Sequence, residues 1–447
     1  MAMIGGGCAS AQGPAASARV DAPPALPVAR AVASAPWPAL AVARARAAVD
    51  TLTSDAFAGR GYDAARGADR AARWAAARMA ATPGVRPLLA GRPTGSPFLH
   101  PFTFDAPIVE RAGLVVGGRA LVLGTDALPL VASRPGEGAG TAAAADAGDL
   151  RGRVAVVATS DSLDARLTRA ARAGAVAAVV LVDALPPYGR GREASPVPAF
   201  FVRREAWPGT DAAPAVRFAL DVRAASAAGA LARVSPIGGA NVVGVVPGTA
   251  VPDSFVVLTA HLDHHGRILD AFGGAPAVFR GANDNASGSA AALALLDTLA
   301  RRPLRYSVVV VLTGAEEQGL VGAEALAASP PWPLGRTALA LNLDMVASGE
   351  TGIGVFGAPE QPARFARMQD DAARLGAGPL VPRAMRPNSD QYAFSRRGVP
   401  ALYLLGYGGR HPYHATGAAA ATLEWDDWAA IVALTHATLR HATGDAR

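Results

Sequence analysis

Short runs of apolar, often β-branched residues recur through the second half of the chain, and each run is followed by a loop and a helical pattern. A run that is apolar at every position, such as 256–260, is typical of a strand covered on both faces. Alternation of strands and helices favours a largely parallel sheet. The pattern predicts strands at 242–246, 256–260, 307–313, 338–343, 354–356 and 401–405, and helices at 287–299, 320–328, 362–375, 390–396 and 425–439. We therefore predict an α/β fold with a mixed, mostly parallel sheet covered by helices on both faces.

The pattern changes between residues 107 and 237. Two apolar runs, 154–158 and 176–182, flank an amphipathic helical pattern at 164–173, and the block contains no histidine. At about 130 residues it has ordinary domain size, and we interpret it as an inserted β-rich α/β domain. Residues 44–79 read as helices interrupted at Gly59-Arg60-Gly61. The predicted divisions are a leader at 1–35, a main domain at 36–106 and 238–447, and the insert at 107–237.

The leader is rich in Ala, Pro, Gly and Ser, which predicts a processed or disordered segment. Residues 4–8 resemble a lipoprotein cleavage box that ends at Cys8, and Ala9-Ser10-Ala11 fits a signal-peptidase site. We therefore expect an exported protein, periplasmic, secreted or lipoprotein-anchored, with Cys8 a candidate for a lipid anchor. Cys8 is the only cysteine, so no intrachain disulfide can form. No later run approaches the ~18 continuous apolar residues of a membrane span.

Composition narrows the function further. Hydrophobic residues make up 51% and charged residues 17%, which argues against wholesale disorder. The formal net charge of +6 comes from arginines that are scattered along the chain, and no basic run carries interleaved aromatic residues. Nucleic-acid binding is therefore disfavoured.

Histidines and carboxylates follow the ends of several predicted strands. His261 and Asp263 follow the run 256–260, and side chains two positions apart on a strand point the same way, so Asp263 could orient His261. Because strand ends in an open α/β sheet converge on one edge, the side chains that follow the other strands should meet His261 there. Histidine and acidic ligands gathered in this way suit a hydrolytic zinc site. The residues expected to meet are His261, Asp284, Glu317, Asp344 and His414.

At these positions the chain resembles the M28 family of zinc aminopeptidases, in particular members with a protease-associated (PA) domain inserted in the catalytic domain. The matching segments are 260–266, 281–288, 314–322, 342–345, 389–390 and 413–414, with further likeness at 55–61 and 241–248. The resemblance spans about residues 45 to 440. It implies a zinc exopeptidase-like fold, a PA-like insert, and a metallo-aminopeptidase that acts on peptides through two zinc ions.

The resemblance also implies a role for each matching residue. Asp284 would bridge the two ions; His261 and Asp344 would complete one metal site, and Glu317 and His414 the other. Glu316 would be the general base, Asp263 would support His261, and Tyr413 would donate a hydrogen bond to the developing oxyanion. Many family members have a cis peptide bond after the bridging aspartate, here between Asp284 and Asn285.

The charges agree with this assignment. Two divalent ions carry +4 and three carboxylates return −3, so a bridging hydroxide would leave the cluster neutral. A zinc pair brings the pKa of water towards ~7. Glu316 could then take the proton of that water while its neighbour Glu317 binds metal.

Four histidine- or serine-containing positions have weaker signals. His264 and His265 read as loop residues or as residues that support the ligands, His411 is an alternative ligand three residues before His414, and Ser389-Asp390 is expected to cap a helix. Tyr413 to Gly417 departs from the family pattern because it lacks the Pro and Asp that commonly follow this histidine. The contact that supports His414 is thus not identified, and we expect its site to bind zinc more loosely.

Two alternative functions remain open at this point. One is another zinc-dependent reaction on the same scaffold, either glutaminyl cyclisation or carboxypeptidase action. The other is a non-enzymatic binding protein that uses the PA-like insert as a docking surface. Because all five ligand types are present, the metallo-aminopeptidase is favoured. The absence of a Gly-x-Ser-x-Gly elbow disfavours a serine hydrolase.

Overall fold

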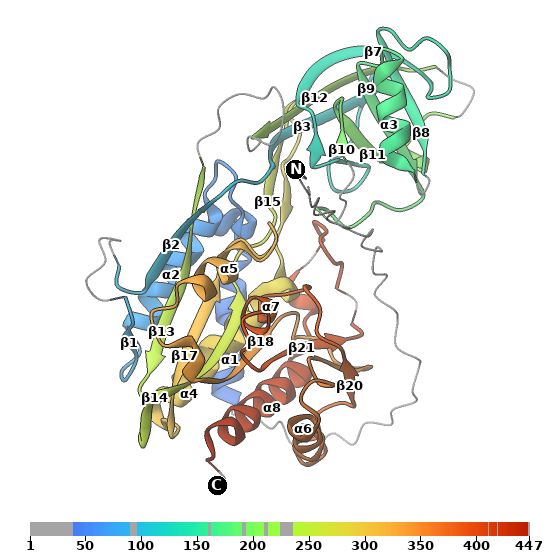
Figure 1. Ribbon diagram of the computed structural model, residues 1–447. Coiled ribbons are helices and arrows are strands. Elements are labelled where there is room, and N and C mark those ends of the chain that lie inside the picture. The colour runs from blue at the N-terminus through green and yellow to red at the C-terminus, as the bar shows by residue number, and fades with distance from the viewer. Residues whose placement is uncertain are drawn as a thin grey trace, which may run out of the picture.

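The computed structural model describes residues 39–89, 96–159, 162–189, 194–209, 213–223, 236–409, 411–417 and 419–445. The predicted leader and Cys8 lie outside these residues. The described chain contains two large β-sheets, one of nine strands and one of ten, which lie in separate parts of the molecule (Figure 1). Among the described residues, no helix combines the length and apolar character needed to cross a bilayer.

The nine-stranded sheet contains all the strands predicted in the second half of the chain. Its centre consists of four parallel strands in the order β17-β14-β18-β21, whereas β13 and β19 pair with this centre in the antiparallel sense. The predicted mostly parallel sheet is therefore parallel at its centre and mixed toward its edges. The strands are β1 (Arg86–Pro87), β2 (Leu99–Phe104), β13 (Ile237–Val246), β14 (Val251–His261), β17 (Tyr306–Thr313), β18 (Thr337–Leu343), β19 (Gly352–Phe356), β20 (Leu380–Arg383) and β21 (Ala401–Tyr407).

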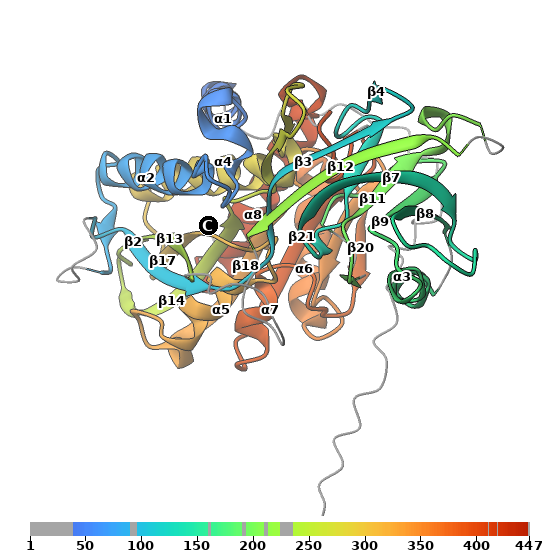
Figure 2. The same ribbon diagram turned by 90° about the horizontal axis from the view of Figure 1, so that it is seen from above.

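Helices cover both faces of this sheet, as predicted (Figure 2). Because side chains alternate along a strand, Val256 and Leu258 pack in the core under one set of helices, and Val257 packs in the core under the other. The first set comprises α1 (Ala39–Leu52), α2 (Gly67–Ala80), α4 (Gly288–Arg301), α6 (Pro362–Leu375) and α8 (Trp425–Thr443); the second comprises α5 (Val321–Ala328) and α7 (Gln391–Ser395). Short 3-10 turns lie at Asp55–Arg60, Arg204–Ala206, Leu334–Arg336 and Ala420–Thr422.

The inserted segment builds most of the ten-stranded sheet. Sheet membership changes between β2 and β3 and again between β12 and β13; the boundaries at 107 and 237 and the PA likeness stay predictions. The strands from this segment are β3 (Ile108–Val116), β4 (Arg119–Ala120), β5 (Ala127–Pro129), β7 (Gly136–Ala144), β8 (Arg153–Ala158), β9 (Ala177–Val182), β11 (Ala199–Arg203) and β12 (Ala215–Arg223), with α3 (Leu163–Arg172) between β8 and β9; β6 (Ala132–Ser133) and β10 (Ala194–Ser195) form a separate pair.

Two strands from outside the insert complete the ten-stranded sheet. They are β15 (Gly266–Asp270) and β16 (Ala277–Phe279), and β15 pairs with β3 in the parallel sense, Leu269 opposite Arg111. The hydrophobic pattern did not predict them because each is only a few residues long. As a result, the insert is hydrogen-bonded to the strand that begins directly after His265.

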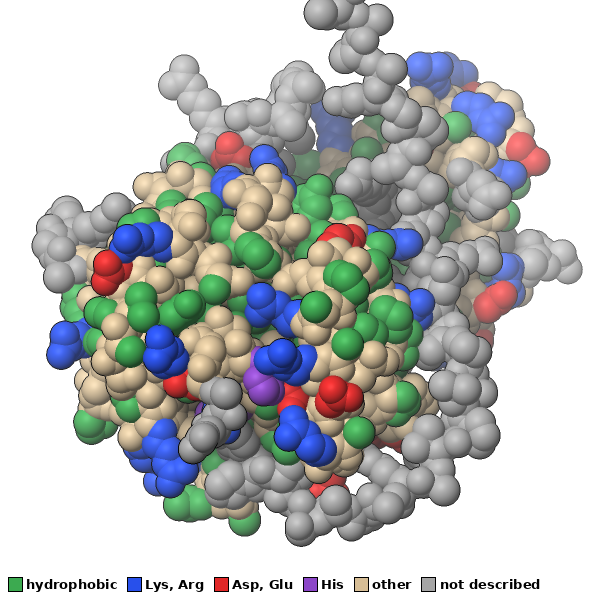
Figure 3. Space-filling view, turned by 60° about the horizontal axis from the view of Figure 1, so that its bottom comes forward, with side chains coloured by type: hydrophobic (Ala, Val, Ile, Leu, Met, Phe, Trp, Pro, Cys, Tyr) green, Lys and Arg blue, Asp and Glu red, His purple; other side chains and the backbone are tan. Residues whose placement is uncertain are grey.

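On the face of the molecule shown in Figure 3, the arginines do not form one patch but lie among acidic and apolar side chains. This agrees with the scattered arginines of the sequence.

Candidate metal centre

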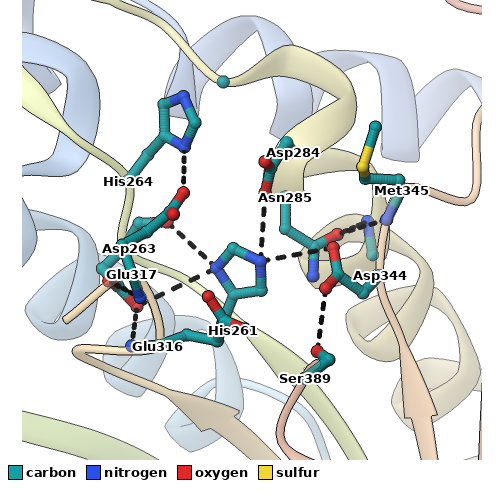
Figure 4. A network of polar contacts seen from close by, with 12 residues as sticks. His261, Asp263, His264, Asp284, Asn285, Glu316, Glu317, Asp344, Met345 and Ser389 are labelled. Atoms are coloured by element: carbon teal, nitrogen blue, oxygen red, sulfur yellow. Dashed lines mark hydrogen bonds and ion pairs between the residues drawn. The ribbon is translucent and has the colours of Figure 1, made fainter. Parts of the chain in front are cut away.

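The five predicted ligands come from five separate segments of the chain. His261 ends β14, Asp284 lies in the turn Ala282–Ser287 that precedes α4, Glu317 follows β17, Asp344 follows β18, and His414 lies in the loop after β21. All are buried or nearly so, and the structure brings them together at one end of the central parallel strands. Figure 4 shows His261, Asp284, Glu317 and Asp344 in this cluster. Convergence of strand ends therefore places these side chains as the sequence predicted.

The side chains form two groups that share Asp284. In the first group, Nε2 of His261 lies 3.1 Å from Oδ1 of Asp284 and 3.3 Å from Oδ1 of Asp344. In the second, Nε2 of His414 lies 3.0 Å from Oδ2 of Asp284 and 3.2 Å from Oε2 of Glu317. One carboxylate thus offers a different oxygen to each group.

The second nitrogen of each histidine is held by a main-chain oxygen. Nδ1 of His261 lies 3.2 Å from the carbonyl oxygen of Asp263, and Nδ1 of His414 lies 2.8 Å from the carbonyl oxygen of Tyr188. These contacts leave both Nε2 atoms directed at the carboxylates, the arrangement a metal-ligating histidine requires. Tyr188 belongs to the inserted segment, which contains no histidine and so cannot supply an imidazole itself.

Asp263 supports the site differently from the prediction. Its carboxylate is 3.9 Å from Nδ1 of His261, so the closer contact is made by its main-chain carbonyl. The carboxylate oxygens instead accept from the backbone N–H groups of Glu316 and Glu317, at 3.2 and 3.4 Å. Asp263 therefore ties β14 to the loop that carries the two glutamates.

His264 and His265 support Glu317 rather than lying free in the loop. Nδ1 of His264 is 2.6 Å from Oε1 of Glu317, and Nε2 of His265 is 3.3 Å from Oε2. His265 Nε2 is also 2.8 Å from Nδ1 of His414. Both histidines are buried, and burial lowers the pKa of each, most strongly that of His265. Both are therefore neutral at pH 7. Nδ1 of His264 is suited to donate to the Glu317 carboxylate, whereas Nε2 of His265 also faces the protonated Nδ1 of His414.

A chain of buried polar side chains supports Asp344. The Ser389 hydroxyl donates to Oδ2 of Asp344 at 2.8 Å, Nδ2 of Asn342 donates to Ser389 at 2.8 Å, and Thr259 donates to Oδ1 of Asn342 at 2.7 Å. Asp390 is the N-cap residue of α7, as expected from its position, but its side chain makes no cap bond to this helix. Ser389 orients the metal-ligand candidate, and Asp390 accepts from Thr313.

The loops of the centre adopt unusual backbone conformations. Gly281 has φ +57, and a Cβ there would lie 2.1 Å from the carbonyl oxygen of Asp284, so only glycine fits. The Asp284–Asn285 peptide bond is cis, as the resemblance implied. Ala315, Met345 and His414 have positive φ values of 54, 56 and 49, a region that non-glycine residues seldom occupy. Positive φ values at non-glycine residues cluster at functional sites because the surrounding structure must hold them.

The pKa values of three ligand candidates are shifted by their neighbours. Burial would lower the pKa of His414, but Glu317 and Asp284 raise it to about 10. Burial likewise opposes the effect of Asp344 and Glu316, which raise the pKa of His261 well above its ordinary value. Burial would raise the pKa of Asp284, yet hydrogen bonds from the two histidines hold it below its usual range. Without metal, both imidazoles carry protons at the positions that two cations would take, so metal binding releases protons.

Arg60 is a supporting residue that the sequence analysis treated only as a helix break. It is fully buried, and burial lowers its pKa to about 10 against the opposing effect of Asp284, Asp263 and Glu317. Its guanidinium donates to the carbonyl oxygens of Leu262, Gly281 and Arg280, at 2.7 to 2.8 Å. It thus fastens the chain next to His261 to the turn before Asp284. Sequence position gave no signal for this long-range contact.

The remaining candidates lie at the edge of the centre. The Tyr413 ring stacks on His414, with centroids 3.8 Å apart, and both line a small hollow beside Asp284. His411 does not join the cluster: its Nδ1 contacts Thr422 and its Nε2 contacts the carbonyl of Ala347. The alternative in which His411 replaces His414 as a ligand is therefore not supported.

The donor set fits a pair of divalent cations. Each group offers one imidazole nitrogen and two carboxylate oxygens, all within 4.8 Å of one another. Ligands bound at about 2.0–2.2 Å to a tetrahedral zinc ion stand roughly 3.3 Å apart, close to the separations observed here. Nitrogen and oxygen donors together favour zinc or a similar transition metal over calcium or magnesium.

Comparison with known proteins points to a metallopeptidase family. A probable zinc metalloprotease of Leptosphaeria maculans is 37% identical over 114 residues, which is 25% of this chain and 26% of that protein. A probable zinc metalloprotease of Pyrenophora teres f. teres is 32% identical over 118 residues, 26% of this chain and 24% of that protein. The match thus spans about a quarter of the length of these curated relatives.

Solved structures share the fold over most of the chain. BSAP, a zinc aminopeptidase from Bacillus subtilis, has a TM-score of 0.65 at 18% identity, covering 90% of this chain and 95% of that one. An aminopeptidase from Aneurinibacillus sp. strain AM-1 has a TM-score of 0.60 at 17% identity, covering 90% and 93%. Residues 241–439 match the sequence profile of peptidase family M28. This segment, which contains all five clustered ligand candidates, is therefore similar to peptidase family M28.

Proposed function

We propose that this protein is a zinc-dependent metallo-aminopeptidase that removes N-terminal residues from peptides with two zinc ions. The observation that carries the proposal is the pair of histidine–carboxylate groups joined through the two oxygens of Asp284. The match of residues 241–439 to peptidase family M28 and the similarity to a probable zinc metalloprotease support the same chemistry.

Each residue of the centre has a role in this proposal. His261, Asp344 and Asp284 would hold one ion, and Glu317, His414 and Asp284 the other. Bound zinc ions would lower the pKa of a water molecule and polarise the substrate carbonyl.

Glu316 is the proposed general base. It lies beside Glu317 and within 4.8 Å of the donor atoms of His261 and Glu317. Burial raises its pKa, and the charges of Glu317 and Asp344 raise it further, against the effect of His261. A carboxylate with a raised pKa can accept a proton and return it to the leaving amine. Tyr413, which lines the hollow beside Asp284, would donate a hydrogen bond to the oxygen that becomes negative.

Purified protein should contain about two zinc ions and should hydrolyse amino-acid anilides. Chelation should abolish turnover, and added zinc should restore it. Glu316→Gln should keep both ions, because the proposed ligand is the neighbouring Glu317 and not Glu316. It should lose turnover, because an amide cannot accept the proton of the water. Unchanged turnover in Glu316→Gln would refute the role of Glu316.

The same assay separates the alternatives on this scaffold. A glutaminyl cyclase would act on peptides that begin with Gln, and a carboxypeptidase would act on peptides with a free C-terminus, whereas the proposed enzyme prefers anilides with a free amino group. Export of the protein, with Cys8 as a candidate lipid anchor, is part of the proposal and can be tested by fractionating cells that express the full chain.

A further inference from the structure

The loop that carries His414 is held by the inserted segment at two places. The Tyr188 backbone N–H donates to the His414 carbonyl at 3.1 Å, and the His414 ring donates from Nδ1 to the Tyr188 carbonyl at 2.8 Å. Two residues further along, the Thr416 hydroxyl donates to the Gly124 carbonyl at 3.4 Å. A Cβ at Gly124 would lie 2.5 Å from Cγ2 of Thr416, so the two segments are in close packing contact.

His414 needs such support because of its backbone. Its φ of 49 lies in the left-handed region, which a non-glycine residue keeps only where surrounding contacts enforce it. The reciprocal pair of bonds with Tyr188 fixes the main chain of His414 and its side chain together. The bond to Nδ1 also selects the tautomer in which Nε2 is free to bind a metal ion.

Tyr188 is in turn fastened to the strand that follows the first ligand. Its buried ring stacks on Phe279 of β16, with centroids 4.5 Å apart and an interplanar angle of 20°, and meets the edge of the His265 ring at 5.2 Å. Next to it, Gly189 has φ +77, and a Cβ there would lie 2.7 Å from Cε1 of His265. β16 pairs with β15, which begins one residue after His265. The segment that follows His261 is therefore linked through β16 to Tyr188 of the insert, and through Tyr188 to His414.

We propose that the inserted segment is a structural part of the second zinc position, with Tyr188 acting through its main chain as a positioning residue for His414. This inference rests on the proposed function, because it requires a metal ion between Asp284, Glu317 and His414. It gives the insert a role in metal binding in addition to any role in substrate or partner recognition.

The test measures metal binding rather than turnover alone. Apo-protein is titrated with Zn²⁺ in competition with a chromogenic chelator and with Co²⁺ followed by visible absorption. Gly189→Ala should push the 188–189 segment away from His265 and weaken the second ion about 10- to 100-fold, the usual cost of losing a contact that orients a ligand, while the first ion binds as before. Tyr188→Ala should act in the same direction because it loses the stack on Phe279.

Two matched variants isolate the contact. Gly118→Ala introduces a side chain at a similar φ of +83 in the insert, but a Cβ there meets nothing within 4 Å, so metal binding should match that of the unsubstituted protein. Tyr188→Phe keeps the ring and the main chain and should bind both ions normally. If Gly189→Ala does not fold, Thr416→Val provides the same measurement, since it keeps the side-chain shape, loses the bond to Gly124 and should weaken only the second ion.

The outcomes distinguish this inference from the proposed function. If the unsubstituted protein binds two ions and Tyr188→Ala, Gly189→Ala and Thr416→Val bind both with unchanged affinity and unchanged Co²⁺ spectra, the positioning role is overturned and the peptidase proposal stands. If the unsubstituted protein binds no second ion, both are overturned.

Discussion

The two halves of the candidate metal centre use the same ligand chemistry but are supported in different ways. His261 and Asp344 end or directly follow the neighbouring parallel strands β14 and β18. Asp344 is oriented by Ser389, whose hydroxyl in turn accepts from Asn342 of β18. Glu317 and His414 lie on loops. His414 is held by the main chain of Tyr188, which lies in the inserted segment 226 residues earlier in the sequence. The comparison teaches that one position is intrinsic to the sheet, whereas the other is assembled from two parts of the chain.

The largest effect should come from removing the residue that both halves share. Asp284→Ala deletes the carboxylate that faces His261 and His414 and leaves two groups with two donors each. Both ions should be lost, and turnover on anilides should fall on the order of 10⁴-fold, the scale seen when a member of a catalytic unit is removed. Metal content by mass spectrometry checks the cause, and retention of two tightly bound ions would contradict the shared role.

Next, single histidine substitutions should separate the halves. His414→Ala should retain one tightly bound ion and lose about 10²- to 10³-fold in turnover, the scale for loss of one electrostatic stabiliser of the transition state. His261→Ala should also keep one ion, but a weaker chelator should remove it. Dialysis of the unsubstituted protein against chelators of increasing strength should release one ion before the other. Simultaneous release of both would mean that the two positions do not differ.

A stability measurement probes the support of the sheet-based half. Arg60→Met leaves the carbonyls of Leu262, Gly281 and Arg280 without their buried donor, so the free energy of unfolding should fall by about 3 kcal/mol or more. Urea unfolding of the metal-free protein gives this value. Arg44→Met is the control, because Arg44 is half exposed and its ion pair with Asp297 is long, at 4.0 Å, so that this pair should contribute about 0–1 kcal/mol.

The smallest effect should follow loss of one hydroxyl. Ser389→Ala removes the donor to Asp344, and the first ion should bind about 10-fold more weakly, at the low end for loss of a ligand-orienting contact, with the second ion unaffected. Ser54→Ala, whose hydroxyl donates to the carbonyl of Thr51, should leave both affinities unchanged. Chelator-competition titrations resolve the two positions, and a weakening confined to the second ion would reverse the assignment.

Sequence patterns predicted the centre well where local rules decide it. The apolar runs placed the C-terminal ends of β14, β17, β18 and β21 within about two residues, although β14 begins earlier than predicted, at Val251. The ends of parallel strands converge, so the residues after them meet. The patterns could not assign supporting contacts. Asp263 was expected to face His261 with its carboxylate, but strand geometry does not determine whether the side chain or the carbonyl makes the closer contact, and here the carbonyl does.

Local sequence patterns could not predict contacts between segments that are distant in sequence. Ser389 was read as a local cap, which is the default role of a serine before a short helix, whereas its hydroxyl serves Asp344. Tyr188 gave no signal at all, since its contribution is made by main-chain atoms that every residue type possesses. Composition therefore excluded the insert as a source of imidazole and was silent about its support of His414.

The pairing of β15 with β3 bears on attempts to exchange the insert among relatives. A graft cut at the two crossings near residues 107 and 237 would leave Gly266–Asp270 and Ala277–Phe279 behind as an orphaned hairpin, with unmatched backbone groups facing a foreign strand. A chimaera that carries this hairpin together with the donor domain should preserve the pairing register between β15 and β3. It should therefore also preserve the position of the loop that carries His414.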